Sequence, residues 1–255
     1  LLPIHHWFFE EKGARDHHNQ SVLLVSPQGI SEEFLREWVT ALYTRHDALR
    51  LRFVPGEAGV RAHYVELDAQ AMAAALECVD LTGLSVPQQL QRLSAEGERL
   101  QRSLSLAQGR LLRVGYFRGD SQSRLLLIVH HAVIDGVSWR IVLEELELAY
   151  HQYQQGEPIG FTPKSSSYQQ WAQYLSGYPA RAQFAAEQRY WQHSLSVPVA
   201  ALPQDEPLEG PPPQPQVGLV QMELSAQATT ALLQRCASAY RTQINELLLA
   251  ALWLA

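Results

Sequence analysis

The sequence lacks the features that define several large functional classes. It holds 20 Lys and Arg against 26 Asp and Glu, a formal net charge of −6, so it lacks the basic surface that nucleic-acid binding requires. No apolar run approaches the roughly 20 residues of a membrane-spanning helix, and the first residues do not resemble a signal peptide. Neither a nucleic-acid partner nor a membrane partner is therefore expected.

Cysteine is scarce, and the sequence has no glycine-rich loop of the kind that cradles phosphate. The two cysteines, Cys78 and Cys236, are too far apart in the sequence to indicate a disulfide scaffold or a zinc knuckle. We therefore expect a reducing, cytoplasmic setting. The sequence also begins without methionine, which leads us to expect an excised part of a longer protein.

The sequence is rich in hydrophobic residues, which follow two different periods. They make up 46% of the chain, against 18% charged residues, which is enough for a sizeable core. Short β-branched segments alternate with helical periods, which predicts an α/β fold. Strands are expected at residues 21–26, 49–54, 60–66, 111–118, 123–130 and 217–224. Helices are expected at 31–45, with Ser31 as N-cap, and at 86–103, 139–155, 167–175, 181–195, 226–240 and from the N-cap Thr242 onward. In the helix at 139–155, the period places Ile141 inside and Glu145 in water.

The composition changes near residue 200. Residues 202–216 hold six prolines, which indicates an extended linker. We therefore expect an N-terminal lobe at 1–200, a Pro-rich linker at 201–216 and the start of a C-terminal lobe at 217–255. The last helix is still apolar where the sequence ends, so the second lobe is expected to be incomplete.

A pair of histidines ends the most apolar strand. Residues 125–129 are continuously apolar, as in a strand covered on both faces, and His130 and His131 follow directly. Successive side chains on a strand point to opposite faces, so one histidine is expected to support the core and the other to face a cavity. Two ordinary core histidines are the simpler interpretation. Asp135 and Gly136 count against it, because they form a tight loop before a helix in which Gly136 is expected to turn the chain with positive φ. A neutral imidazole in this position is suited to general base catalysis near pH 7.

Other chemistries fit the loop less well. The stretch from Gly136 to Arg140 resembles the start of a nucleophile elbow, but Arg140 stands where the second glycine belongs. His131 and Asp135 lack a third ligand at a diagnostic spacing, so no metal is expected.

The seven residues His130-His131-Ala-Val-Ile-Asp135-Gly136 resemble the His-His-x-x-x-Asp-Gly motif of condensation-type domains of nonribosomal peptide synthetases, which chloramphenicol acetyltransferase-like enzymes share. Residues 3–8, 45–50 and 245–250 also resemble motifs of this superfamily, in the same order. Within it, Gly136-Val137-Ser138-Trp139, together with residues 7–10 and 18–21, resembles the epimerization domain.

The resemblance implies a fold and an activity. The fold would be a chloramphenicol acetyltransferase-like α/β lobe, a mixed sheet flanked by helices, plus the beginning of a second similar lobe. A peptidyl carrier protein domain would deliver an aminoacyl or peptidyl thioester on 4′-phosphopantetheine, with neighbouring synthetase domains as further partners. Acid/base proton transfer at Cα would convert the L to the D configuration. The domain itself would bind no cofactor, because the thioester already acidifies the Cα proton.

The resemblance also implies roles for single residues. His131 would be the catalytic acid/base group, and His130, Asp135 and Gly136 would support the loop. Arg45 is the predicted ion-pair partner of Asp135, because a buried carboxylate needs a cation or several donors. Backbone N–H groups of Val137, Ser138 and Trp139 open a helix and are predicted to form an oxyanion site or to line the substrate channel.

One part of the epimerization site is missing from these residues. The family places a glutamate opposite the histidine, in a Glu-Gly-His-Gly-Arg-Glu stretch of the second lobe that this sequence does not contain. We therefore expect residues 1–255 alone to be inactive. Two alternatives remain open, a condensation domain that forms amides with the same histidine and a non-catalytic fragment that docks a carrier.

Overall fold

The computed structural model describes residues 1–10, 15–27, 29–57, 59–198 and 220–254. The chain divides into two compact units, Leu1–Ser196 and Val197–Ala255. The predicted linker at 201–216 lies outside the described residues. Within the described ranges, no helix is long and apolar enough to cross a membrane.

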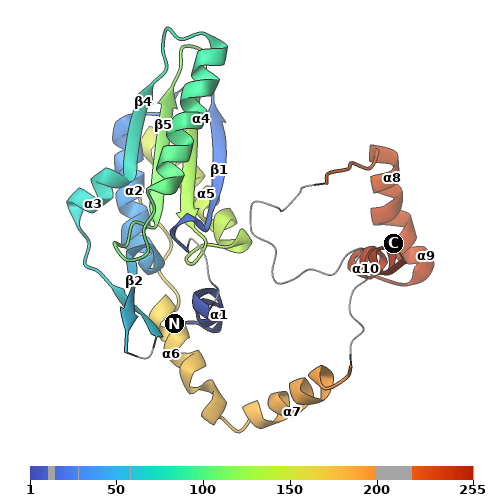
Figure 1. Ribbon diagram of the computed structural model, residues 1–255. Coiled ribbons are helices and arrows are strands. Elements are labelled where there is room, and N and C mark those ends of the chain that lie inside the picture. Colours follow the sequence, from blue (N-terminus) through green and yellow to red (C-terminus); the bar gives the residue numbers. More distant parts are fainter. Residues whose placement is uncertain (11–14, 28, 58, 199–219, 255) are drawn as a thin grey trace, which may run out of the picture. The chain divides into compact units, whose positions relative to one another are not determined.

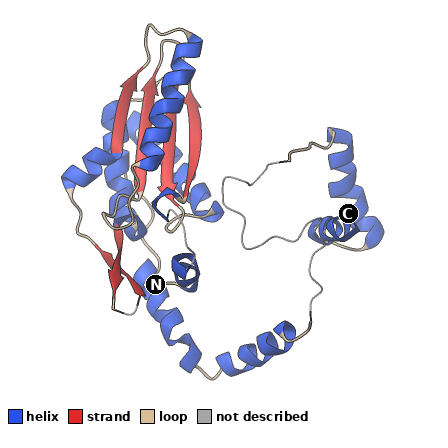
Figure 2. Ribbon diagram, viewed as in Figure 1, coloured by secondary structure: helices blue, strands red, loops and turns tan. Residues whose placement is uncertain are grey.

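A four-stranded mixed sheet forms the centre of the first unit, as Figures 1 and 2 show. Its order is β1-β6-β5-β4, in which β4 runs parallel to β5 and the other pairs are antiparallel. The strands are β1 (Asn19–Ser26), β4 (Leu76–Asp80), β5 (Leu112–Arg118) and β6 (Ser123–His130). A separate hairpin joins β2 (Leu51–Gly56) and β3 (Gly59–Tyr64). Both predicted hairpins are confirmed, whereas β4 was not predicted.

Helices cover both faces of this sheet. Helices α2 (Glu32–Arg45) and α5 (Gly136–Gln154) pack on one face and α4 (Val86–Arg102) on the other. The other helices of this unit are α1 (Pro3–Glu10), α3 (Ala69–Ala75), α6 (Tyr168–Gly177) and α7 (Phe184–Leu195), with short 3₁₀ turns at Arg15–His17, Asp47–Arg50 and Tyr178–Ala180. The predicted start of α2 is confirmed, because the Ser31 hydroxyl caps it by accepting the N–H of Phe34. Helix α3 was not predicted.

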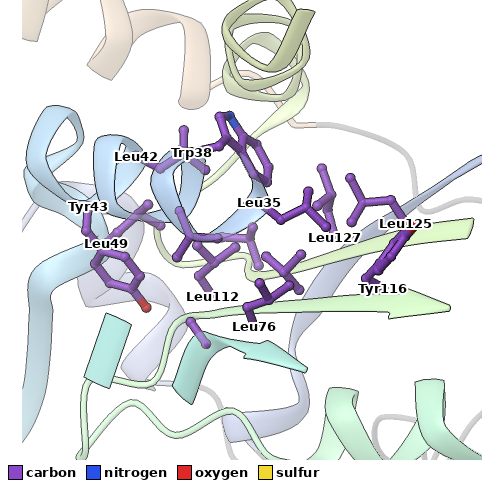
Figure 3. Close-up of a cluster of buried hydrophobic side chains, with 14 of the residues drawn as sticks. Leu35, Trp38, Leu42, Tyr43, Leu49, Leu76, Leu112, Tyr116, Leu125 and Leu127 are labelled. Atoms are coloured by element: carbon purple, nitrogen blue, oxygen red, sulfur yellow. The ribbon is translucent and has the colours of Figure 1, made fainter. Parts of the chain in front are cut away.

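Strand β6 is covered on both faces, as its unbroken apolar sequence predicts. Leu125 and Leu127 pack in one core cluster with α2 and α5, and Figure 3 shows them facing Leu35 and Trp38 of α2. Leu126 and Ile128 belong to a second cluster, with Leu100 of α4. The strand therefore holds its end, where the histidines begin, in a fixed position between two packed layers.

The second unit consists of helices α8 (Ala226–Ala231), α9 (Ala237–Tyr240) and α10 (Ile244–Leu254), with a π-helical turn at Leu232–Cys236. The predicted strand at 217–224 is wrong over its described part, since residues 220–224 are irregular and exposed. A strand needs a neighbour to pair with, and the described residues of this unit supply none. Thr242 is not the N-cap of α10, because the helix begins at Ile244 and the Glu246 carboxylate accepts the N–H of Gln243.

Candidate active site

The loop between β6 and α5 carries the residues that the sequence singled out. It is closed by Asp135, whose Oδ1 accepts the backbone N–H of Ser138 at 2.8 Å and the Ser138 hydroxyl at 2.7 Å. These hydrogen bonds from Ser138 lower the pKa of Asp135. Asp135 is therefore the N-cap of α5, which begins at Gly136, three residues earlier than predicted.

His130 is fully buried and supports the loop from inside. Its Nε2 lies 2.7 Å from the carbonyl oxygen of Arg15, which can only accept, so Nε2 carries the proton. The backbone N–H of Ala132 donates to the other ring nitrogen, Nδ1, at 3.0 Å. Burial lowers the pKa of His130, which keeps the ring neutral in this environment.

His131 is partly exposed and is held on both ring nitrogens. Its Nδ1 lies 2.8 Å from the carbonyl oxygen of Ile134, and its Nε2 lies 3.1 Å from the amide nitrogen of Gln20 on β1. The ring stacks on His18, with 5.0 Å between the ring centroids and an interplanar angle of 14°. Its backbone N–H donates to the His18 carbonyl oxygen, which ties the loop to the start of β1.

A cavity of about 420 Å³ lies against the loop. His131, Asp135 and Ser138 contribute to its wall, and most of its other lining residues are apolar. His5 of α1 and Tyr168 of α6 also line it. The chemistry of the site is thus an imidazole beside a mostly apolar space.

Arg45 does not reach Asp135, so the predicted ion pair is wrong. The Nε of Arg45 lies 3.7 Å from Glu145 Oε1, and His46 Nε2 donates to Glu145 Oε2 at 2.5 Å. The cation that the sequence assigned to the loop thus belongs to a contact between α2 and α5. Asp135 is satisfied by the donors of its own helix start instead.

The burial of two side chains of α5 differs from what the hydrophobic period of this helix predicted. Glu145 is only 9% exposed, which corrects its predicted place on the solvent face, and Ile141, predicted inside, is 45% exposed at the wall of the cavity. The position of Glu145 could have been found, because it shares a stripe with Val142, three residues before it, and Ala149, four residues after. A polar residue on an apolar stripe indicates a buried partner, which here is the pair Arg45 and His46.

The other predicted loop residues have different roles from those expected. Gly136 is the first residue of α5 and does not have positive φ. The N–H groups of Val137 and Ser138 interact with the Asp135 carboxylate, and that of Trp139 donates to the Asp135 carbonyl oxygen. These N–H groups are therefore engaged by the helix cap and the first helical turn, so they are not free to act as oxyanion donors. Ser138 does line the cavity, which agrees with the alternative prediction of a channel residue. The Trp139 side chain is 9% exposed and packs in the core, and Val137 points to solvent.

Sequence reasoning missed two residues that touch the loop. Gln20 contacts His131, and the buried His5 contacts Ala132. Both lie in segments that resemble family motifs, residues 3–8 and 18–21, which was a signal for them, but nothing in the sequence indicated the contacts that they make. No group of three or more His, Cys, Asp or Glu side chains within the described ranges is arranged to hold a metal ion.

Comparisons with known proteins agree on one family. The family described as Condensation domain matches residues 1–255. One of the linear gramicidin synthase proteins of Brevibacillus parabrevis is 40% identical over 255 residues, which are 99% of this chain and 5% of that protein. The chain thus spans a small part of the curated relatives that it matches.

Solved structures show the same fold. The epimerization domain from the third module of tyrocidine synthetase B matches with a TM-score of 0.86 and 29% identity, over 99% of this chain and 57% of that one. The starter condensation domain of rhizomide synthetase matches with a TM-score of 0.59 and 20% identity, over 71% of this chain and 43% of that one. These matches confirm the predicted chloramphenicol acetyltransferase-like α/β fold.

Proposed function

The chain belongs to the condensation domain family, and we propose that within this family it is part of an epimerization domain, with His131 as an acid/base group. One comparison carries the proposal. The epimerization domain resembles this chain with a TM-score of 0.86 at 29% identity, against 0.59 at 20% identity for the starter condensation domain. The Val137-Ser138-Trp139 segment after the motif glycine favours the same choice.

The proposed reaction is a proton exchange at the Cα of an aminoacyl or peptidyl thioester. The lone pair of His131 Nε2 takes the Cα proton, and the electron pair of the broken C–H bond delocalises onto the thioester oxygen. A proton then returns to Cα on the opposite face, and the histidine gives its proton back to solvent. The neutral ring suits this step, because Nδ1 holds its proton against the Ile134 carbonyl and leaves Nε2 bare. The opposing acid is proposed to come from a part of the domain outside these residues.

The substrate is proposed to arrive on the 4′-phosphopantetheine of a peptidyl carrier protein domain, with no cofactor bound by the domain itself. Neighbouring synthetase domains and a cytoplasmic setting are part of the same proposal. The mostly apolar cavity beside His131 suits an uncharged aminoacyl side chain.

The test is to load a carrier domain with an L-aminoacyl group and to add a domain that contains this chain together with the rest of the fold. The expected result is a rising D/L ratio, lost in His131→Ala and kept in His6→Ala, a matched change of an exposed histidine. Residues 1–255 alone should leave the substrate in the L form. An unchanged D/L ratio in His131→Ala would remove the assignment of the base.

Condensation is the second candidate, because the family that matches the whole chain is that of the condensation domain. The same histidine would then assist the attack of an amine on a thioester. Adding a second, aminoacyl-loaded carrier to the same assay distinguishes the two, since only condensation transfers the acyl group to it and forms an amide.

A further inference from the structure

We propose that Gln20 is a positioning residue that, together with the Ile134 carbonyl, fixes the neutral tautomer of His131, with the proton on Nδ1 and the lone pair on Nε2. The inference deepens the proposed function, on which its consequence for catalysis rests. Its structural part concerns only Gln20, Trp139 and His131 and can be tested without any reaction.

The first step is the orientation of the Gln20 amide. The Nε1 of Trp139 lies 2.9 Å from Gln20 Oε1. An indole N–H can only donate a hydrogen bond, so the amide oxygen must face Trp139 and the amide nitrogen must face the other way. Trp139 is itself held in the core, at 9% exposure, in the first turn of α5. The orientation of the amide therefore follows from a buried group that cannot reverse its polarity.

The second step is the protonation of the imidazole. The Gln20 amide nitrogen, now a donor, lies 3.1 Å from His131 Nε2, so Nε2 must accept and carries no proton. On the other side of the ring, Nδ1 lies 2.8 Å from the Ile134 carbonyl oxygen, which accepts and so requires a proton on Nδ1. Two contacts from different segments of the chain thus require the same tautomer.

The third step is the placement of Gln20 by the sheet. Gln20 is opposite Val129 in the antiparallel pair of β1 and β6, two residues before His131. The register therefore fixes the distance between the amide and the end of β6, and a slip of one residue would turn Gln20 to the other face of the sheet. Trp139 approaches from α5, so one strand, one loop and one helix meet at the His131 ring.

The consequence for catalysis follows from the direction of the Nε2 lone pair. In this structure the Gln20 N–H occupies the position from which Nε2 would accept a Cα proton. Substrate must displace that N–H, and its Cα proton then faces an Nε2 that is already unprotonated. A glutamate at position 20 would reverse the polarity, because a carboxylate oxygen accepts from Trp139 equally well but requires a proton on Nε2.

The test uses Gln20→Glu and the donor-free, similarly sized Gln20→Met. Imidazole ¹⁵N shifts of the 255-residue chain are recorded at about pH 8, where a free imidazole is neutral, and the His131 signals are assigned by their loss in His131→Ala. We expect wild type to show a protonated Nδ1 and a bare Nε2. We expect Gln20→Glu to place a proton on Nε2. We expect Gln20→Met to show a measurable share of the Nε2-protonated form, because only the Ile134 carbonyl then favours a proton on Nδ1. A bare Nε2 in Gln20→Glu would overturn the proposal.

Trp139→Phe is a second variant that leaves Gln20 in place. Without the indole N–H the amide is free to turn over and to offer its oxygen to Nε2. The expected result is again a measurable share of the Nε2-protonated form, held down only by the Ile134 contact. A single tautomer identical to that of wild type would contradict the role given to Trp139. Because the two variants change different elements, a folding defect in one leaves the other to decide.

Activity of the whole domain gives a separate readout. Blocking Nε2 in Gln20→Glu should lower kcat for epimerization by about 10²-fold or more, within the range of general acid/base effects, with little change in KM. A rise in KM of about the same factor, with kcat unchanged, would indicate that Gln20 binds substrate and would overturn the positioning role. If the tautomer responds as expected but the wild-type domain does not epimerize, the proposed function fails and the role of Gln20 at His131 stands.

Discussion

The Nε2 of His5 donates to the carbonyl oxygen of Ala132 at 2.7 Å, so a residue of the first helix supports the loop that carries His131. His5 is 2% exposed, and its other ring nitrogen accepts the Tyr168 hydroxyl at 2.8 Å. Tyr168 opens α6, 163 positions along the chain from His5. The loop is thus contacted by His5 of α1 and by Gln20 of β1, and Tyr168 of α6 holds His5 in place.

We expect His5→Ala to lower the free energy of unfolding by about 1–3 kcal/mol, because the partly buried Ala132 carbonyl loses its donor. Tyr168→Phe removes one hydrogen bond and should lower it by about 0.5–1.5 kcal/mol. Urea denaturation of both single variants and the double variant measures the coupling between them. Strict additivity would show that the His5–Tyr168 contact contributes nothing to stability.

Stability should fall as the pH falls below about 6.5. Burial lowers the pKa of His5 and of His130 from the ordinary value of 6.5. Below that value the unfolded chain binds protons at these two histidines while the folded chain does not. Their contribution to the free energy of unfolding is therefore complete above pH 6.5 and is lost as the pH falls toward the folded-state pKa. Urea denaturation from pH 8 to pH 5 should show this loss, and His5→Phe should show less of it. A constant stability across this range would contradict the burial of the two neutral rings.

The contribution of Asp135 to stability should depend on pH in a more acidic range. Hydrogen bonds from Ser138 lower its pKa from the ordinary value of 3.8, so its contribution is present above that value and is lost as the pH falls through the folded-state pKa. At neutral pH, Asp135→Ala should lower the free energy of unfolding by about 1 kcal/mol through loss of the helix cap. Asp135→Asn should lower it much less, because an asparagine side chain can also cap a helix. The exposed Glu147→Ala on the same helix is the matched control for charge removal. Equal effects of Asp135→Ala and Asp135→Asn would speak against a capping role.

The observed partner of Arg45 can be tested by two double-mutant cycles. Arg45→Ala and Glu145→Ala should be non-additive by about 0.5 kcal/mol or more, because the two side chains form an ion pair. Arg45→Ala and Asp135→Ala should add within about 0.5 kcal/mol, because these side chains make no contact. Coupling of Arg45 with Asp135 instead of Glu145 would restore the ion pair that sequence reasoning predicted.

The helices and strands with a clear hydrophobic pattern were predictable from the sequence, and those that depend on distant contacts were not. Strand β6 and helix α2 have long, unambiguous patterns, and both lie where the sequence placed them. Helix α3 is an alanine-rich segment without an apolar stripe, and β4 is a five-residue strand that exists because β5 pairs with it in parallel. Short segments of this kind have no local signal that outweighs their context.

The site shows the same division. The His-His pair and the capping aspartate lie within six residues of one another, so the motif located them. The partners of these residues depend on how elements meet. Glu145 is the partner of Arg45 because of the way α5 lies against α2, and Gln20 contacts His131 because of the register of β1 on β6.

The most direct test of the proposed function is the incorporation of solvent deuterium at Cα. An L-aminoacyl carrier is incubated in D₂O with the whole domain that contains this chain, and the released amino acid is analysed by mass spectrometry and chiral chromatography. Epimerization predicts one deuterium at Cα, a D/L mixture, and loss of both in His131→Ala. An L product without deuterium, together with amide formation when a second aminoacyl carrier is added, would contradict the account and assign the chain to condensation.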